Sequence, residues 1–352
     1  MFINDLTIFL RKNREISDSL RKSLTSNQWG SKVQKQYVSQ MFEPLNHLHS
    51  IDLKRKIVTP VKSESNKITA PRDYHMSQMD VLCPYSTPDG KKVGLVKQPS
   101  IQCLLSLERN VNSRVWEMLA DIPKRYIFYD NEFELDCAFV FVNGQWLCST
   151  RVPHVDIFLR ALKKLKLEWF DVSVHYNVYD RVVHVTSDSG RVLTPLLMND
   201  EWRSCTSIHE CLSNGSLQLL DKHEMEHLVV HDEYDLFATS KIAYPSYMLH
   251  LMALSHMGAL IPFSNHNQSP RNIYQIGMCK QSFGSPRHVD IGNQLELSLT
   301  GPQVALSASI VQTSESFYET PTGVNVILAV MPFEGFNQED SIIFNRQAIE
   351  RG

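Results

Sequence analysis

The chain has 352 residues, of which 43% are hydrophobic, 21% charged and 9% aromatic. This composition is that of an ordinary globular protein with room for two or more domains, and it excludes a collagenous, low-complexity or wholly disordered chain. The formal net charge of -3 excludes a bulk polycation that binds nucleic acid by charge alone. The charge is unevenly spread, since residues 1–72 carry 13 basic and 6 acidic side chains. This basic section is either a local phosphate-binding surface or a solvated face.

The cysteines and the apolar runs indicate a soluble, intracellular protein. The seven cysteines are odd in number and irregularly spaced, and no C-x-x-C pair occurs, so we expect reduced thiols and no zinc site made by this chain alone. The one long apolar run, 246–263, is interrupted by His250 and His256 and ended by Pro262. It predicts a buried helix over 246–260 rather than a membrane span.

The first hundred residues alternate helical and loop patterns. Residues 1–48 place apolar positions at near-helical spacing, and 81–100 are rich in turn residues. Between them, 54–70 reads as an exposed basic loop. Its candidate nucleic-acid contacts are Lys54, Arg55, Lys56, Lys62 and Lys67.

A compact α+β module is predicted over about 133–197. A hairpin spans 133–148 around an Asn-Gly turn, a helix opens at Pro153, and strands follow at 172–178, 182–186 and 191–196. Beyond the module we expect an acidic helix at 217–235, another helix at 271–281, and mainly strands over 292–345. The most apolar of these strands are 324–330 and 341–344.

One acidic segment matches a metalloprotease pattern. His223, Glu224 and His227 form H-E-x-x-H, which on a helix can bind zinc through two histidines with the glutamate as general base. The surrounding carboxylates are more typical of a solvated acidic helix, and no third ligand stands out.

Two polar blocks could carry phosphate or metal chemistry. In the first, Ser269 is expected to cap a helix whose opening turn holds Arg271, and a guanidinium beside free helix-start N–H groups suits a phosphate. The alternative is a buried polar network. In the second, Glu339 and Asp340 follow an apolar strand, where adjacent carboxylates indicate either a cation site or an exposed acidic turn.

Taken together, these blocks resemble one family. The segments SNHNQSPRNIYQIGMCKQ (264–281) and GFNQEDSIIFNRQAIERG (335–352) are similar to motifs of the second-largest, β-type subunit of multisubunit DNA-directed RNA polymerases, in their eukaryotic, archaeal and large-DNA-virus form. CPYSTPDGKKVGLVK (83–97) resembles the fork segment of that family. The resemblance implies an α+β, multidomain fold with a mixed, β-rich core and helices. It divides the chain into a fork-like region (1–118), an external-1-like module (119–199), an external-2-like acidic segment (200–240) and the start of the hybrid-binding region (241–352).

The resemblance also implies roles for individual residues. Arg271 would contact the incoming nucleotide's phosphates, and Glu339 and Asp340 would lie near the second Mg²⁺, making weak or indirect contact. The expected nucleotide- and hybrid-binding residues are Gln268, Arg271, Tyr274, Lys280 and Gln281. The implied partners are the largest subunit, which holds most of the Mg²⁺ ligands, the other polymerase subunits, the DNA template, the RNA–DNA hybrid and nucleoside triphosphates. The reaction would be nucleotidyl transfer by the complex, with the isolated chain inactive and no membrane involved.

The chain departs from the family in sequence and in length. Ser86 stands where the family usually has a glutamate, and the divergence suggests a viral or plasmid polymerase. Family members are roughly three times longer, so the chain corresponds to a central piece. Two other functions stay open beside the polymerase: a non-catalytic assembly module that keeps the external domains for docking, and the zinc hydrolase.

Overall fold

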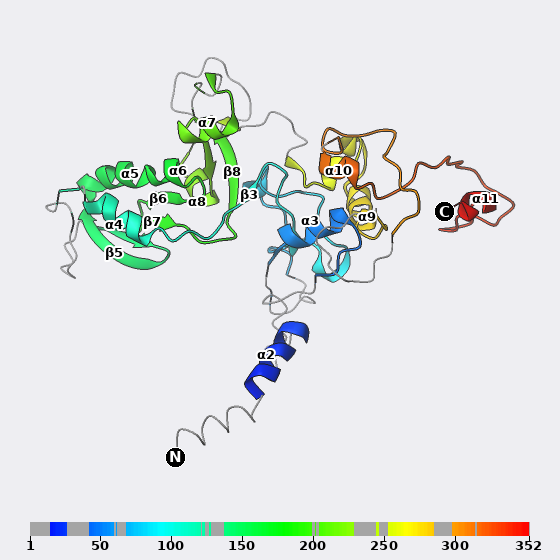
Figure 1. Ribbon diagram of the computed structural model, residues 1–352, viewed down its shortest axis with the longest axis horizontal. Helices are drawn as coiled ribbons and strands as arrows, with labels where there is room; N and C mark the ends of the chain where they lie inside the picture. Colours follow the sequence, from blue (N-terminus) through cyan, green and yellow to red (C-terminus); the bar gives the residue numbers. More distant parts are fainter. Residues whose placement is uncertain are drawn as a thin grey trace. The chain divides into compact units, whose positions relative to one another are not determined.

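The computed structural model describes residues 15–26, 42–59, 61, 68–120, 122–123, 127, 137–198, 201, 204–228, 244–245, 253–284, 298–313 and 315–351. The chain forms two compact units (Figure 1). Unit 1 combines 1–76, 83–98 and 256–352, and unit 2 combines 77–82 and 99–255. Helices and sheets are mixed, so the expected α+β, multidomain class is confirmed. The four region boundaries inferred from the sequence stay predictions.

Unit 2 is built on a four-stranded mixed sheet with the order β5-β4-β7-β6. Its strands are β4 (Cys137–Val142), β5 (Gln145–Arg151), β6 (Ser173–Asn177) and β7 (Val182–Thr186). β4 and β7 run parallel, and the other two pairs are antiparallel. The predicted hairpin is confirmed over 137–148, while 133–136 lie outside the described residues. Asn143 and Gly144 both have positive φ, 48° and 81°, which the two-residue turn requires.

The strand register gives this sheet one buried apolar face and an opposite face that carries histidine side chains. Val174 pairs with Val185, and Val183 pairs with Val140, so these valines share the buried face. That face packs against three helices (Figure 1), namely α4 (Asn112–Ala120), α5 (Val155–Lys163) and α6 (Leu165–Glu168). Because side chains alternate along a strand, the neighbouring residues point to the opposite face, which places His175 opposite His184 there.

A second sheet of unit 2 is centred on β8 (Val192–Leu197). Its other strands are β3 (Leu104–Leu105), β9 (Leu217–Leu220) and β10 (Tyr244–Pro245). The strand predicted at 191–196 therefore exists, but it pairs in this second sheet rather than with β6 and β7. The acidic helix predicted over 217–235 is wrong in its first part. Residues 217–220 form β9, which follows α7 (Ile208–Ser213), and the short α8 (Lys222–Met225) comes next. The last part of the predicted helix, 229–235, lies outside the described residues.

Unit 1 places a short helix against a longer one. The elements that matter below are α3 (His47–Arg55), a two-stranded pair of β1 (Ile57–Val58) with β2 (Val96–Lys97), and α9 (Ser269–Cys279). Leu48 of α3 packs with Met257, Ile261 and Ile276 in a buried cluster. The unit also contains α2 (Glu15–Ser26), α10 (Glu315–Glu319) and α11 (Arg346–Glu350).

Three sequence predictions for unit 1 and its border need correction. Of the apolar helix expected at 246–260, residues 246–252 lie outside the described residues, and 253–260 form turns that end in a 3-10 helix, Gly258–Leu260. Residues 324–330 and 341–344 are described without a strand, because none of the described segments pairs with them.

Within the described residues, no helix is long and apolar enough to cross a bilayer.

Candidate functional site

The polar block 264–272 folds into a tight turn followed by α9. Phe263 adopts a left-handed conformation (φ 50°), and the 3-10 helix Ser264–His266 comes next. Asn272 is fully buried, donates to Ser264 O at 2.9 Å and accepts from Asn267 Nδ2 at 3.2 Å. The predicted buried polar network therefore exists, with Asn272 at its centre.

Arg271 lies outside that network, on the exposed side of the first turn of α9. Its guanidinium carbon is 5.7 Å from the ring centroid of Tyr274, a cation–π contact along the same helix. Among the described residues, the structure records no carboxylate paired with Arg271. The predicted cap at Ser269 is wrong: Gln268 is the N-cap residue and makes no side-chain capping bond, so the helix-start N–H groups lack a side-chain cap.

The far end of α9 is in a different environment. Lys280 follows the helix directly, and its ammonium lies 2.7 Å from Asp52 Oδ1, a carboxylate that is almost fully buried. Gln281 is exposed beside it. Of the expected nucleotide- and hybrid-binding residues, Gln268, Arg271, Tyr274 and Gln281 are therefore exposed, whereas Lys280 is tied to α3.

Glu339 and Asp340 lie on an exposed loop. Asn337 shapes this loop by donating to Met331 O at 2.6 Å and accepting from Phe333 N at 2.9 Å. Glu339 has φ 54°, an uncommon value for a residue other than glycine. Among the described residues, no group of three His, Cys, Asp or Glu side chains could hold a metal ion. Two adjacent carboxylates offer the oxygen ligands that Mg²⁺ prefers, and they fit a shared or water-mediated contact better than a complete site.

The basic residues expected in one exposed loop are placed differently. Lys54 and Arg55 form the last turn of α3, and Lys56 caps it, so the first part of the loop prediction is wrong. Lys54 lies over the ring of Phe42, 5.6 Å from its centroid. Lys62 and Lys67 lie outside the described residues. The α3 carbonyl end attracts cations through the helix dipole, which accounts for basic residues ending this helix.

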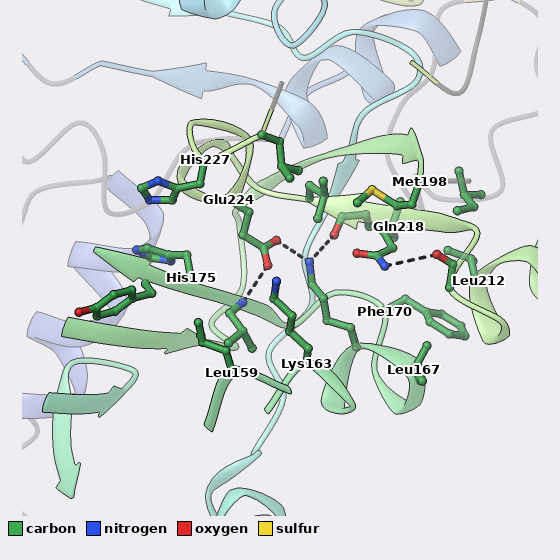
Figure 2. A pocket seen from close by; sticks show the side chains of 18 residues that line it. Leu159, Lys163, Leu167, Phe170, His175, Met198, Leu212, Gln218, Glu224 and His227 are labelled. Carbon is green, nitrogen blue, oxygen red and sulfur yellow. Dashed lines mark hydrogen bonds and ion pairs between the residues drawn. The ribbon is translucent and has the colours of Figure 1, made fainter. Parts of the chain in front are cut away.

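The H-E-x-x-H segment forms a structural contact in unit 2. Glu224 is buried; its carboxylate lies 2.5 Å from Lys166 Nζ and accepts the Val174 backbone N–H at 2.9 Å (Figure 2). Burial raises the pKa of Glu224 and lowers that of Lys166, while their mutual attraction opposes both shifts. A carboxylate held in this way is not a free general base, so the zinc-hydrolase interpretation loses the residue it needs.

The two histidines of the segment join a stack of rings on the outer face of the sheet. His175 lies 5.0 Å from His184 and 5.2 Å from His223, measured between ring centroids, and His227 follows at 6.4 Å. His175, Glu224 and His227 are among the residues that line a cavity of about 230 Å³, and Figure 2 shows their side chains near one another. Stacked imidazoles present faces to one another rather than converging nitrogens, which is unlike a zinc site.

Sequence reasoning missed three side chains of these sites: Asn46, Asp52 and Lys166. Each is polar or charged, each is buried, and each has its partner far away in the sequence. The only local signal was at Asn46, a favourable N-cap residue three positions before His49.

Comparisons with known proteins find matches along most of the chain. Models of RNA polymerase Rpb2 match the chain in three places: domain 3 over residues 40–105, domain 4 over 140–200 and domain 6 over 257–352. The chain belongs to the family of second-largest RNA polymerase subunits. The domain 6 match contains Arg271, Glu339 and Asp340.

Relatives of this family come from viruses, eukaryotes and archaea. A probable RNA polymerase II subunit RPB2 homolog of Invertebrate iridescent virus 6 is 30% identical over 372 residues, 97% of this chain and 30% of that protein. RPB2 of Encephalitozoon cuniculi is 28% identical over 366 residues, 96% of this chain and 32% of that protein. Subunit Rpo2 of Sulfolobus acidocaldarius is 28% identical over 371 residues, 96% of this chain and 32% of that protein. The chain spans about a third of the length of the curated relatives it matches.

Proposed function

We propose that this chain contributes the nucleotide-facing part of a DNA-directed RNA polymerase. The observation that carries the proposal is Arg271: an exposed guanidinium in the first turn of α9, without a carboxylate partner among the described residues, inside the domain 6 match. A planar guanidinium can bridge two phosphate oxygens, and the side-chain-uncapped helix start favours an anion.

In this proposal the neighbouring residues assist substrate binding. Tyr274 supports the guanidinium through its ring, and Gln268 and Gln281 are exposed hydrogen-bonding groups at the two ends of the helix. Lys280 belongs to the same block, with its charge already engaged by Asp52. Arg271 would align the α-phosphate for in-line attack and offset the charge that develops on the leaving pyrophosphate.

Bound Mg²⁺ would supply charge neutralisation at the transferring phosphoryl group, and most of its ligands would come from the largest subunit. Glu339 and Asp340 would add outer carboxylate contacts from their exposed loop. The basic end of α3, with Lys54, Arg55 and Lys56, would contact the phosphates of the template duplex or of the opening bubble. The setting would be a nucleus, a host cytoplasm or a virion.

A polymerase assembled with this chain tests the proposal. Template-dependent nucleotide addition is expected from the complex and absent from the purified chain alone. Replacing Glu339 and Asp340 together by alanine should raise the Mg²⁺ concentration needed for half-maximal rate, with assembly intact. An unchanged Mg²⁺ requirement would remove these carboxylates from the site. If an inactive scaffold could take the place of this chain in the complex without lowering the rate of nucleotide addition, the chain would instead be a non-catalytic docking module.

A further inference from the structure

Asn46 connects the start of α3 to the end of α9. Its side chain is fully buried, and its Oδ1 accepts the His49 N–H at 2.8 Å, which caps α3. Its Nδ2 donates to Cys279 O at 2.9 Å and to Ser282 O at 2.7 Å. Cys279 is the last residue of α9, where backbone acceptors have no partner within the helix, and Ser282 lies three residues beyond it. One amide therefore satisfies the ends of two helices.

Asp52 makes a second connection between the same two elements. Its carboxylate is only 3% exposed and pairs with Lys280 Nζ at 2.7 Å. Burying a carboxylate is unfavourable unless a cation compensates it, so the position of Lys280 is strongly determined. The backbone O of Asp52 accepts from the buried Gln98 side chain at 2.8 Å, which ties α3 to the residue that follows β2 as well.

Tight packing surrounds these polar contacts. Leu48 of α3 and Ile276 of α9 belong to one buried cluster. A Cβ added at Gly284 would lie 3.1 Å from the Asn46 Cβ, closer than side chains normally approach. The end of α9 is thus fixed by two polar contacts and by close packing. At its beginning the buried Asn272 bonds to the preceding turn, whereas the Arg271 side chain next to it is exposed.

We infer that Asn46 and Asp52 are positioning residues, which hold the C-terminal end of α9 and thereby determine where the Arg271 guanidinium lies. This inference rests on the function proposed above. Eight residues of helix separate Arg271 from Cys279, roughly 12 Å at 1.5 Å per residue, so a tilt of about 5° at the held end moves Arg271 by roughly 1 Å. A displacement of about 1 Å in a positioning group can lower a rate by roughly 100-fold.

Asn46→Ser separates the capping of α3 from the hydrogen bonds to the end of α9. Serine keeps an oxygen that can cap α3, but it cannot donate to Cys279 O and Ser282 O. In the assembled polymerase, we expect Asn46→Ser to lower kcat/KM for single-nucleotide addition by about tenfold with assembly unchanged. Ser207→Ala is the matched control: it removes the N-cap of α7 in unit 2, and it should leave the rate within about twofold of wild type.

The double variant with Arg271→Ala decides whether Asn46 acts through Arg271. If it does, Asn46→Ser should change the rate by less than about twofold once Arg271 is alanine, because the group it positions is gone. Asp52→Asn provides a second variant for the same cycle, should Asn46→Ser fail to assemble. Multiplicative effects, with the full Asn46→Ser loss on top of Arg271→Ala, would overturn the positioning inference alone. An Arg271→Ala variant at the wild-type rate would overturn the proposed function and this inference together.

Discussion

Glu224 accepts the backbone N–H of Val174, at 2.9 Å, from the side of an edge strand. β6 is the last strand of its sheet, so among the described strands this N–H has no further neighbour to pair with. The second carboxylate oxygen is held by Lys166, and Asp221 caps α8 through a capping box with Glu224. Glu224 therefore holds α8 against the edge of the sheet. The glutamate of the H-E-x-x-H segment thus stabilises the fold.

Glu224→Gln should destabilise unit 2. The amide can still occupy the site, but it leaves the Lys166 ammonium buried without its counter-charge, a loss of about 3 kcal/mol, or roughly 100-fold faster local opening. Hydrogen exchange at the Val174 amide in the whole chain measures it. Glu226→Gln is the control, because Glu226 is exposed next to the same helix. Equal exchange rates in both variants would contradict the structural role.

The histidine stack predicts a dependence of unit 2 stability on pH. Burial and the neighbouring His184, with smaller contributions from His223 and His227, lower the pKa of His175 to about 4, against attraction by Asp221. Burial also lowers the pKa of His184. The folded state thus binds fewer protons than the unfolded state below the ordinary value of 6.5. The stability that these two histidines contribute is fully present above pH 6.5 and is lost as the pH falls toward 4.

Exchange of the β6 and β7 amides at pH 7 and pH 5, corrected for intrinsic rates, measures this loss. Protection should be lower at pH 5 in the wild-type chain. His175→Phe keeps a stacked ring that does not titrate, so its protection should differ less between the two pH values. Wild-type protection that is the same at both pH values would refute the prediction.

Local patterns in the sequence predicted local structure well. The Asn143-Gly144 turn and the strand 182–186 were predicted correctly, because turn chemistry and alternation act over a few residues. The same logic failed at 217–220, where acidic neighbours suggested a helix but pairing with β8 decides the conformation. It failed at 324–330 for the opposite reason: a strand pattern is present, and none of the described segments pairs with it.

The candidate site was predictable in its exposed part only. Pro270 and the polar block around it placed Arg271 in the first turn of a helix. The contacts of Asn46 with Cys279 and of Asp52 with Lys280 span more than two hundred residues, and nothing in the neighbourhood of either residue indicates its partner.

The apolar segment 324–330 should make the isolated chain associate with itself. Val326, Ile327, Leu328 and Val330 are all at least 72% exposed, which is unfavourable for a monomer in water. Sedimentation of the purified chain should show oligomers, and Ile327→Asp with Val330→Lys should shift it toward a monomer. In the assembled polymerase, the same two substitutions should weaken assembly if a partner covers the segment. A monodisperse wild-type monomer would count against this prediction.

The basic end of α3, together with the lysines Lys62 and Lys67 that follow it in the sequence, should bind nucleic-acid phosphates through charge. Replacing Lys54, Arg55, Lys56, Lys62 and Lys67 by alanine should flatten the salt dependence of complex stability, by about 0.9 in the log–log slope for each phosphate that is no longer neutralised. Binding of the assembled enzyme to a template duplex, compared between about 50 and 200 mM salt, measures this slope. Lys163→Ala with Lys164→Ala removes exposed charge from unit 2 and serves as the control. An unchanged slope would mean that α3 ends in a solvated surface.

Single-nucleotide addition by an assembled polymerase carrying Arg271→Ala tests the central claim most directly. Removing one positioned charged donor from such a site costs on the order of 3 kcal/mol, so the rate should fall by roughly 100-fold while assembly is intact. Arg271→Lys should recover part of the rate, because an ammonium makes one point contact where a guanidinium bridges two oxygens. An Arg271→Ala rate within about twofold of wild type would contradict the account and leave Arg271 as a surface residue stacked on Tyr274.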